Sequence, residues 1–274
     1  MKIGILREEK VPSDKRVVFT PKQCKWITEN TNIDLVVESS DIRCFPDSDY
    51  SNLGIEVVNN LSYCDVLLGV KEVPISSLIS NKIYFYFSHT IKEQSYNRDL
   101  LQEMVQKNIT MIDYEVLKDK NNKRLIGFGR YAGIVGAYNA LLTYGLKSDK
   151  FFLKSANKCS GINEVHQELN KIKLSTEKII LTGKGRVSNG ALEILRKANI
   201  KEVSKEDFID KTFNETVFCR LKTMDYNERI DGSLSDKYDF YNNPEKYQSS
   251  FMNYTKHADI FIAGHFYGVG SPYL

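Results

Sequence analysis

Short apolar runs recur along the chain at intervals that leave room for a helix between them. This pattern predicts β-strands joined by crossover helices. Hydrophobicity within each run is continuous rather than alternating, which favours a largely parallel sheet covered on both faces. The strands expected in the first part of the chain are Ile3–Leu6, Leu35–Val37, Val66–Val70, Ile83–Phe87 and Met111–Ile112.

A helical period follows the fourth of these runs. Between residues 96 and 107, apolar residues recur at the spacing of one helical face. The side chains expected on that face are Leu100, Leu101, Met104 and Val105.

From Gly127 to Gly145 the chain is rich in glycine and alanine at three- and four-residue spacing. Small side chains let a helix approach another backbone closely, although each interior glycine costs up to about 1 kcal/mol of helix propensity. This segment is either a helix that links two domains or an ordinary, tightly packed helix. The spacing alone favours neither interpretation.

A second strand-and-helix series follows a Lys-rich stretch. Its expected strands lie at 178–183, 201–203, 216–219 and 258–262. The chain has 274 residues, which is long for a single domain and sufficient for two domains with separate hydrophobic cores. The fold class is therefore α/β, with two Rossmann-like domains and mainly parallel sheets.

Charge and cysteine content narrow the range of partners and cellular locations that we expect. The 38 basic and 35 acidic side chains are mixed along the chain, without the basic block that tracks nucleic acid or a lipid surface. The five cysteines form no Cys-x-x-Cys pair, which is typical of reduced thiols. The N-terminus becomes charged before a signal region forms, and no apolar run is long enough for a membrane span. We expect a cytoplasmic protein without nucleic-acid or membrane partners.

A glycine-rich turn ends the run 178–182 and opens an amphipathic helix. It places Gly183 and Gly185 where free backbone N–H groups stabilise a pyrophosphate. The motif departs from G-x-G-x-x-G because Ser188 occupies the third glycine position, so a plain tight turn is the alternative. Glu202 and Glu206 are both candidates to hold the ribose, which leaves NAD or NADP open.

Titratable side chains follow three neighbouring strands of the first half. Lys71, His89 and Glu115 each come directly after a predicted strand, where open α/β sheets bind ligands. A lysine whose pKa is lowered by burial and a histidine can share proton transfers at neutral pH. Singly, each residue also fits a structural role as a strand-end charge, a hydrogen-bonded core residue or a helix cap. Arg16 and Arg124 fit either surface cations or clamps for substrate carboxylates.

Several segments together resemble a known family. They are Arg7-Glu8, Arg16-Val-Val-Phe-Thr-Pro21, Val70-Lys-Glu-Val-Pro74, Phe87-Ser-His89, Asp113-Tyr-Glu115 and Phe128-Gly-Arg-Tyr-Ala-Gly133. In this order they are similar to the alanine dehydrogenase/transhydrogenase N-terminal superfamily, and above all to the lysine-forming saccharopine dehydrogenases. The resemblance covers nearly the whole chain.

The resemblance implies an NAD-dependent amino-acid oxidoreductase of lysine metabolism that cleaves saccharopine to lysine and 2-oxoglutarate. It implies that Lys71 and His89 are the acid–base pair. The implied substrate-binding residues are Arg16, Glu72, Gln94, Glu115 and Arg124. The implied cofactor-binding residues are Gly183, Gly185, Arg186, Val187, Gly190, Ala263 and Gly264.

The resulting expectation is a substrate and catalytic domain over residues 1–128, followed by a linking helix and dinucleotide-binding domain over residues 129–274. The chain stops at Leu274, about ten residues after the last expected strand, where a complete doubly wound domain continues. We therefore expect the second domain to be incomplete. The alternatives are an alanine-dehydrogenase-like enzyme acting on a small amino acid and a non-catalytic binding or regulatory module. The substrate and the oligomeric state stay open.

Overall fold

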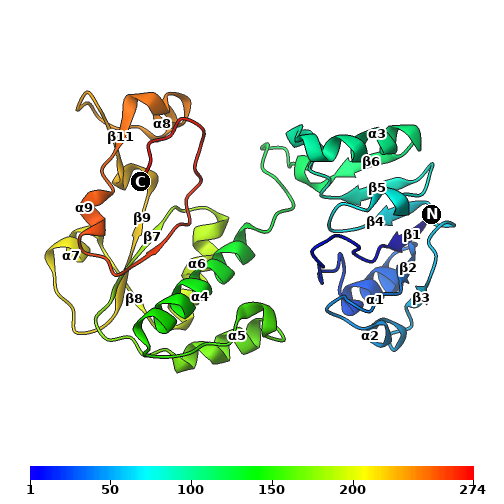
Figure 1. Cartoon of the computed structure of the whole chain (residues 1–274), viewed down its shortest axis with the longest axis horizontal. Coiled ribbons are helices and arrows are strands. Elements are labelled where there is room, and N and C mark those ends of the chain that lie inside the picture. Colours follow the sequence, from blue (N-terminus) through cyan, green and yellow to red (C-terminus); the bar gives the residue numbers. More distant parts are fainter. The chain divides into compact units, whose positions relative to one another are not determined.

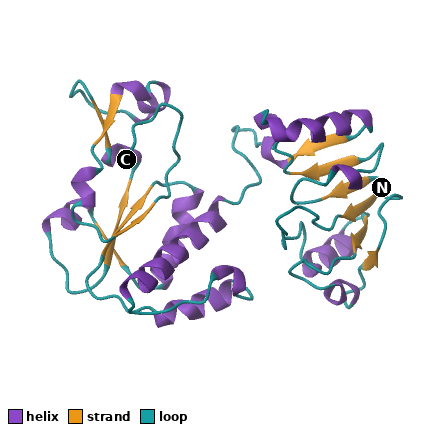
Figure 2. Cartoon of the chain, in the orientation of Figure 1, coloured by secondary structure: helices purple, strands orange, loops and turns teal.

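The computed structural model describes residues 1–274 and divides into two compact units, residues 1–127 and 128–274 (Figure 1). The predicted boundary lay one residue later, after residue 128. Both units combine helices with a parallel sheet (Figure 2). The α/β class with two mainly parallel sheets is therefore confirmed. Every helix is too short or too polar to cross a lipid bilayer.

The first unit contains a six-stranded sheet in the order β3-β2-β1-β4-β5-β6, with every neighbouring pair parallel. This is the strand order of the doubly wound nucleotide-binding folds. Five of its strands lie at the predicted positions, and β3 was missed because it is short and only partly buried. The strands are β1 (Lys2–Ile5), β2 (Asp34–Glu38), β3 (Glu56–Val58), β4 (Val66–Leu68), β5 (Ile83–Tyr86) and β6 (Thr110–Asp113).

Helices α1 (Pro21–Asn30) and α2 (Asp47–Ser51) cover one face of this sheet. Side chains alternate along β2, so Leu35 and Val37 point to that face. There they share a buried cluster with Cys24 and Tyr50. The other face is therefore left for the third helix.

Helix α3 (Arg98–Gln106) covers the opposite face, where Leu100 and Met104 are buried against the sheet. The predicted face was too wide, because Leu101 and Val105 are exposed. Both follow a buried residue by one position and are rotated away from the sheet by about 100°.

The second unit contains a four-stranded parallel sheet in the order β12-β7-β9-β8. All four strands were predicted. The separate antiparallel pair of β10 and β11 was not. The strands are β7 (Lys178–Thr182), β8 (Lys201–Val203), β9 (Val217–Leu221), β10 (Asn227–Arg229), β11 (Tyr247–Ser249) and β12 (Ile260–Ile262). The helices are α4 (Gly129–Ser148), α5 (Ile162–Glu168), α6 (Arg186–Lys197), α7 (Lys205–Asp210), α8 (Lys237–Asn242) and α9 (Met252–Thr255).

Short 3-10 turns connect many of these elements. They are η1 (Ile75–Ser77), η2 (Thr90–Lys92), η3 (Ser95–Asn97), η4 (Tyr114–Val116), η5 (Ala156–Lys158), η6 (Leu169–Lys171), η7 (Thr223–Asp225) and η8 (Pro244–Lys246).

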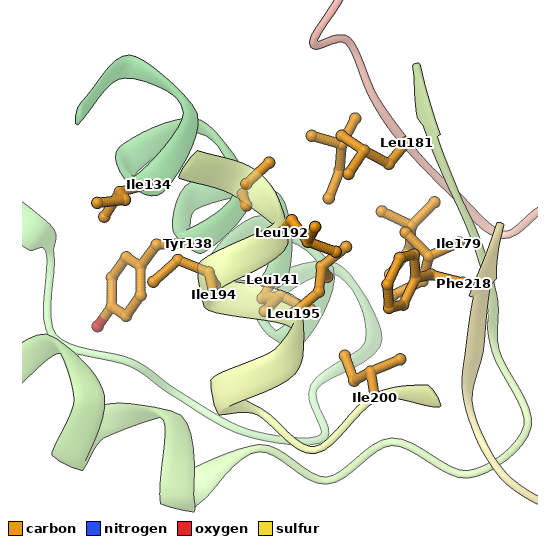
Figure 3. Close-up of a cluster of buried hydrophobic side chains, with 14 of the residues drawn as sticks. Ile134, Tyr138, Leu141, Ile179, Leu181, Leu192, Ile194, Leu195, Ile200 and Phe218 are labelled. Atoms are coloured by element: carbon orange, nitrogen blue, oxygen red, sulfur yellow. The ribbon is translucent and has the colours of Figure 1, made fainter. Parts of the chain in front are cut away.

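The core of the second unit lies between its sheet and helices α4, α5 and α6. Ile179 and Leu181 of β7 point into this cluster, together with Phe218 of β9 (Figure 3). Ile180, between them, points to the other face and packs with Phe208 of α7. The sheet is thus buried on both faces, as its continuous hydrophobicity predicts.

Helices α4 and α6 touch through their backbones. A Cβ atom at Gly133 would come 1.8 Å from the carbonyl oxygen of Val187, and one at Gly190 would come 1.9 Å from that of Arg130. Only glycine fits at either position. The glycine-rich segment is therefore a tightly packed helix of the second unit, which begins two residues after the division between the units.

Candidate functional site

The carboxyl ends of four strands in the first unit carry charged side chains. Glu8 follows β1, Lys71 follows β4, His89 follows β5 and Glu115 follows β6. Because these strands are parallel neighbours in the sheet, their ends meet at one edge. Open α/β sheets bind ligands at that edge.

The loop that carries His89 is held in an unusual conformation. His89 has φ +58°, a left-handed backbone conformation that is uncommon for residues other than glycine. Beside it, the backbone N–H and the hydroxyl of Ser88 both donate to Oδ2 of the buried Asp113, at 3.1 and 2.6 Å. Oδ1 of Asp113 accepts the backbone N–H of Glu115 at 2.7 Å. One carboxylate therefore fixes the loops of His89 and Glu115 together.

Lys71 and His89 lie in direct contact, with Nζ 3.2 Å from Nε2. The same ring nitrogen lies 3.7 Å from Oε1 of Glu72. On the other side of the ring, Nδ1 lies 3.2 Å from Oε2 of Glu115 and 2.9 Å from Nζ of Lys92. Each nitrogen of His89 can thus accept a proton from a lysine or donate one to a glutamate. This arrangement can move a proton through the imidazole.

The environment of Lys71 favours proton exchange. Burial lowers the pKa of Lys71, and the charges of Arg16 and Lys10 lower it further, while Glu72 opposes them. Glu8 holds the backbone of this segment, since its carboxylate accepts the N–H groups of Val70 and Lys71 at 2.6 and 2.9 Å. Burial raises the pKa of Glu8, against these two hydrogen bonds.

The two glutamates beside His89 stay ionised despite being partly buried. Burial alone would raise the pKa of Glu72, but it is outweighed by the hydrogen bond from Lys10, 2.8 Å away, a backbone hydrogen bond and the charges of Lys10 and His89. The pKa of Glu115 is likewise lowered, because contacts with His89, Lys92 and Arg124 outweigh its burial. Both carboxylates can therefore stabilise positive charge on the imidazole.

The predicted arginines lie near this cluster, each beside an acid of the chain. Nη2 of Arg124 donates to Oε1 of Glu115 at 2.9 Å. Nε of Arg16 donates to Oδ1 of Asp14 at 2.9 Å, and Arg16 is close enough to influence the pKa of Lys71. Gln94 is exposed and accepts from the hydroxyl of Tyr96 at 2.7 Å, which is a contact outside the cluster around His89.

Some members of the cluster were missed as site residues in the sequence. They are Glu8, Lys10, Asp14 and Lys92. Lys92 had a local signal, because it follows His89 by three residues and one helical turn brings such residues together. The partners of Glu8 and Lys10 lie about sixty residues away along the chain.

The glycine turn of the second unit has the geometry that its sequence predicts. Gly183 has φ +89°, and a Cβ atom there would come 2.5 Å from the carbonyl oxygen of Gly264. Ser188, in place of the third glycine, is buried and donates its hydroxyl to the carbonyl of Gly183 at 2.7 Å. Nε of Arg220 donates to that hydroxyl at 2.9 Å. The serine that replaces the third glycine of the motif thus forms a hydrogen bond that closes the turn.

A pocket of about 590 Å³ opens beside this turn and the N-terminus of α6. Five predicted cofactor residues line it: Gly183, Gly185, Arg186, Val187 and Gly264. The other lining residues are Lys184, Lys222, Thr223, Met224, Lys237, Tyr241, His265 and Phe266. Four of the lining side chains are cations and none is a carboxylate, so the pocket suits an anionic ligand.

Other predicted cofactor residues lie elsewhere. Gly190 packs against α4, and neither it nor Ala263 lines the pocket. Glu202 and Glu206 do not line it either. The strand that ends beside the glycine turn is β9. β8, the second strand of the series, lies at the sheet edge; it contains Glu202, and the helix after it, α7, contains Glu206.

Comparison with known proteins finds similarity in the first unit. Residues 4–135 match the family model "Alanine dehydrogenase/PNT, N-terminal domain". The match covers nearly all of the first unit and the beginning of α4. The six-stranded sheet and the charged ends of its strands thus lie within the region that this family model matches.

Curated relatives of this domain extend the similarity to the second unit. The chain is 28% identical to mitochondrial α-aminoadipic semialdehyde synthase of Mus musculus over 300 residues, which cover 99% of the chain and 32% of that protein. It is 27% identical to saccharopine dehydrogenase [NAD(+), L-lysine-forming] of Yarrowia lipolytica, over 77% of the chain and 60% of that enzyme. The chain thus spans about a third of the first relative's length and less than two thirds of the second's.

Solved structures share the fold. An L-alanine dehydrogenase matches with a TM-score of 0.54 and 15% identity, over 82% of the chain and 62% of that protein. A transhydrogenase from Sinorhizobium meliloti matches with a TM-score of 0.52 and 16% identity, over 75% and 59%. The family model and the curated relatives bear out the resemblance expected from the motifs, and these two solved structures show the same fold.

Proposed function

We propose that this chain is an amino-acid dehydrogenase that interconverts saccharopine with lysine and 2-oxoglutarate, using a nicotinamide dinucleotide. The contact between Lys71 and His89 carries the proposal, because two exchangeable bases 3.2 Å apart suit a reaction with several proton transfers. The named saccharopine enzymes support the substrate class.

In the oxidative direction, hydride leaves the carbon attached to the secondary amine and passes to the oxidised nicotinamide, which leaves an imine. Water adds to the imine carbon, and the resulting carbinolamine breaks its C–N bond to release lysine and 2-oxoglutarate. Lys71 and His89 remove the protons of the amine and of the attacking water and return one to the departing nitrogen. Glu72 and Glu115 stabilise the imidazole when it carries the extra proton.

Arg16 and Arg124 are the proposed contacts for substrate carboxylates. A guanidinium has five N–H donors, so each arginine can hold an acid of the chain and a substrate oxygen together. Gln94 is kept as a proposed substrate contact on the strength of the family resemblance alone. The dinucleotide is proposed to occupy the pocket beside Gly183 and Gly185.

The charge of that pocket favours a phosphorylated ribose, although the family name led us to expect NAD. An NAD site places a carboxylate where the ribose hydroxyls bind, whereas a cation there accommodates the 2′-phosphate of NADP. Here Lys222 follows β9, the strand beside the glycine turn, and lines the pocket. We therefore propose NADP(H) as the preferred cofactor.

The decisive experiment follows NADPH and NADH oxidation by the purified chain with lysine and 2-oxoglutarate, each alone and together. We expect oxidation only when both are present, and its loss in Lys71→Met but not in a Lys120→Met control, since Lys120 is exposed. Turnover with pyruvate and ammonia instead would support an alanine-dehydrogenase-like enzyme. Dinucleotide binding without any turnover would support a non-catalytic module.

Cofactor preference is tested separately by titration. Lys222→Ser should weaken NADPH binding about tenfold and leave NADH binding unchanged, because one charge-assisted hydrogen bond is lost. Lys256→Ser is the control, since this exposed lysine does not line the pocket. If Lys222→Ser loses affinity for NADPH and NADH equally, a contact between Lys222 and the 2′-phosphate is contradicted.

A further inference from the structure

His265 lies in the dinucleotide pocket although none of the family motifs includes it. It follows β12 by three residues, and it lines the pocket together with the glycine turn. A Cβ atom at Gly183 would come 2.9 Å from the Cα of His265, so the two backbones pass in close contact. The side chain is therefore placed at the turn by the main chain itself.

Two neighbours fix the imidazole ring. Nδ1 lies 2.7 Å from Oγ1 of the buried Thr182, and the ring meets that of Tyr226 edge to face at 5.8 Å. Burial lowers the pKa of His265, and no charged side chain adjusts it. The ring is accordingly neutral at pH 7, so one nitrogen carries a proton and the other does not.

The hydroxyl of Thr182 contacts one of the two ring nitrogens. Its oxygen accepts the backbone N–H of Gly264 at 3.3 Å, and we assign its own hydrogen to Nδ1, which lies 2.7 Å away. With Nδ1 accepting, the proton of the imidazole lies on Nε2. None of the hydrogen bonds of the structure uses Nε2, so this neutral donor has no partner within the chain, and the residue that carries it lines the pocket.

The position of β12 indicates which half of a dinucleotide this donor meets. β7, which carries the glycine turn, lies between β9 and β12. A dinucleotide binds across such a point with its two nucleotides over opposite sides. Lys222 follows β9 on the side proposed for the phosphorylated adenosine ribose, and His265 follows β12 on the other side.

We propose that Nε2–H of His265 donates a hydrogen bond to an oxygen of the nicotinamide nucleotide, and so positions that half of the cofactor. This inference rests on the proposed dinucleotide function. It adds a contact that neither the motifs nor the comparisons assign. A neutral donor holds an oxygen without bringing a positive charge near the cationic ring of the oxidised cofactor.

The test compares His265→Leu, which removes the donor, with His265→Gln, whose amide N–H₂ can replace it. Calorimetric titrations of the full chain would use NADPH, nicotinamide mononucleotide and 2′-phospho-ADP-ribose. We expect the Leu variant to bind the first two about tenfold more weakly and the third within about twofold, the cost of one hydrogen bond in a partly buried site. The Gln variant should recover most of the lost affinity.

A spectroscopic measurement reports on the ring directly. The chain has only four histidines, so side-chain ¹H–¹⁵N spectra of the protein and of His265→Gln identify the His265 signals. We expect the pattern of a neutral ring protonated at Nε2, and a shift of these signals when nicotinamide mononucleotide is added.

The outcomes separate the two proposals. Suppose that the unaltered chain binds NADPH. If His265→Leu binds NADPH equally well, or if its affinity for 2′-phospho-ADP-ribose falls as much as its affinity for NADPH, the role of His265 is overturned and the proposed function stands. If the unaltered chain binds no dinucleotide, both are overturned.

Discussion

Opposing effects on single side chains set the chemistry of the first unit. Lys71 shows this most clearly, because burial lowers its pKa while the carboxylate of Glu72 raises it. Glu72 in turn is kept ionised by Lys10. The readiness of Lys71 to lose a proton therefore depends on a pair of residues that do not themselves need to react.

Glu72→Gln removes the one nearby charge that most strongly keeps Lys71 protonated. We expect the pKa of Lys71 to fall further, so the ionisation of Lys71 in the pH profile of kcat/KM should move to lower pH. Glu29→Gln, an exposed residue of α1, is the control. A profile that moves to higher pH, or does not move, would contradict this account of Lys71.

Glu177 supplies a residue-scale test of stability in the second unit. Burial alone would raise its pKa, but hydrogen bonds from Lys150, Ser175 and Tyr144 lower the pKa to about 2, against 4.5 for an ordinary glutamate. A lowered folded-state pKa adds stability above pH 4.5, which is lost as the pH falls toward 2. The difference corresponds to about 3 kcal/mol.

Glu177→Gln should therefore lower the free energy of unfolding at pH 7 by about 3 kcal/mol and flatten its decline between pH 4.5 and 2. Denaturant unfolding at a series of pH values measures both effects. Glu245→Gln, at an exposed position, serves as the control. If the free energy of unfolding of Glu177→Gln declines as steeply at acid pH as that of the unaltered chain, other carboxylates cause the decline.

At the scale of elements, local patterns predicted strands well and contacts between elements poorly. Continuous apolar runs located most strands of both sheets, because a strand buried on two faces needs apolar side chains throughout. The same patterns did not distinguish Leu100 from Leu101 on α3, since only the partner sheet decides where the buried face ends. They also left open whether the glycine-rich helix links the units or packs tightly, which the backbone contact between α4 and α6 decided.

That contact is tested by a pair of substitutions in α4. Gly133→Ala should lower the free energy of unfolding by about 3 kcal/mol, because its Cβ would meet the carbonyl of Val187 and force the helices apart. Gly136→Ala meets nothing within 4 Å and should raise it by up to about 1 kcal/mol through helix propensity. Equal effects in thermal or denaturant unfolding would disprove the close approach.

At the scale of the whole molecule, two kinds of chemistry lie on different units. The cluster around Lys71 and His89 belongs to residues 1–127, and the cationic pocket with its glycine turn belongs to residues 128–274. In the proposed enzyme the first unit supplies acid–base groups and the second binds the dinucleotide. Variants in each unit should therefore fail in different ways.

Lys71→Met should reduce kcat at least about 100-fold and leave the Kd for the dinucleotide nearly unchanged, because it removes only a proton-transfer group. Gly185→Ala should instead weaken binding of the dinucleotide. Its Cβ meets no protein atom within 4 Å, so the fold tolerates it, but it fills space that a pyrophosphate needs. Gly161→Ala, also in open space, is the control. A Gly185→Ala chain that binds the dinucleotide normally would place the cofactor elsewhere.

The sequence by itself determined the fold class, the position of most strands, the glycine turn and the strand-end residues Lys71, His89 and Glu115. These follow from local periodicity and from short motifs, which need no knowledge of distant parts of the chain. Only the tertiary structure decided that β9 lies beside β7, that Lys92 and Glu115 compete for the same nitrogen of His89, and that His265 lines the pocket. The physical reason is that these relations join segments far apart in sequence or depend on side-chain geometry, and both are set by how the sheet and its helices pack.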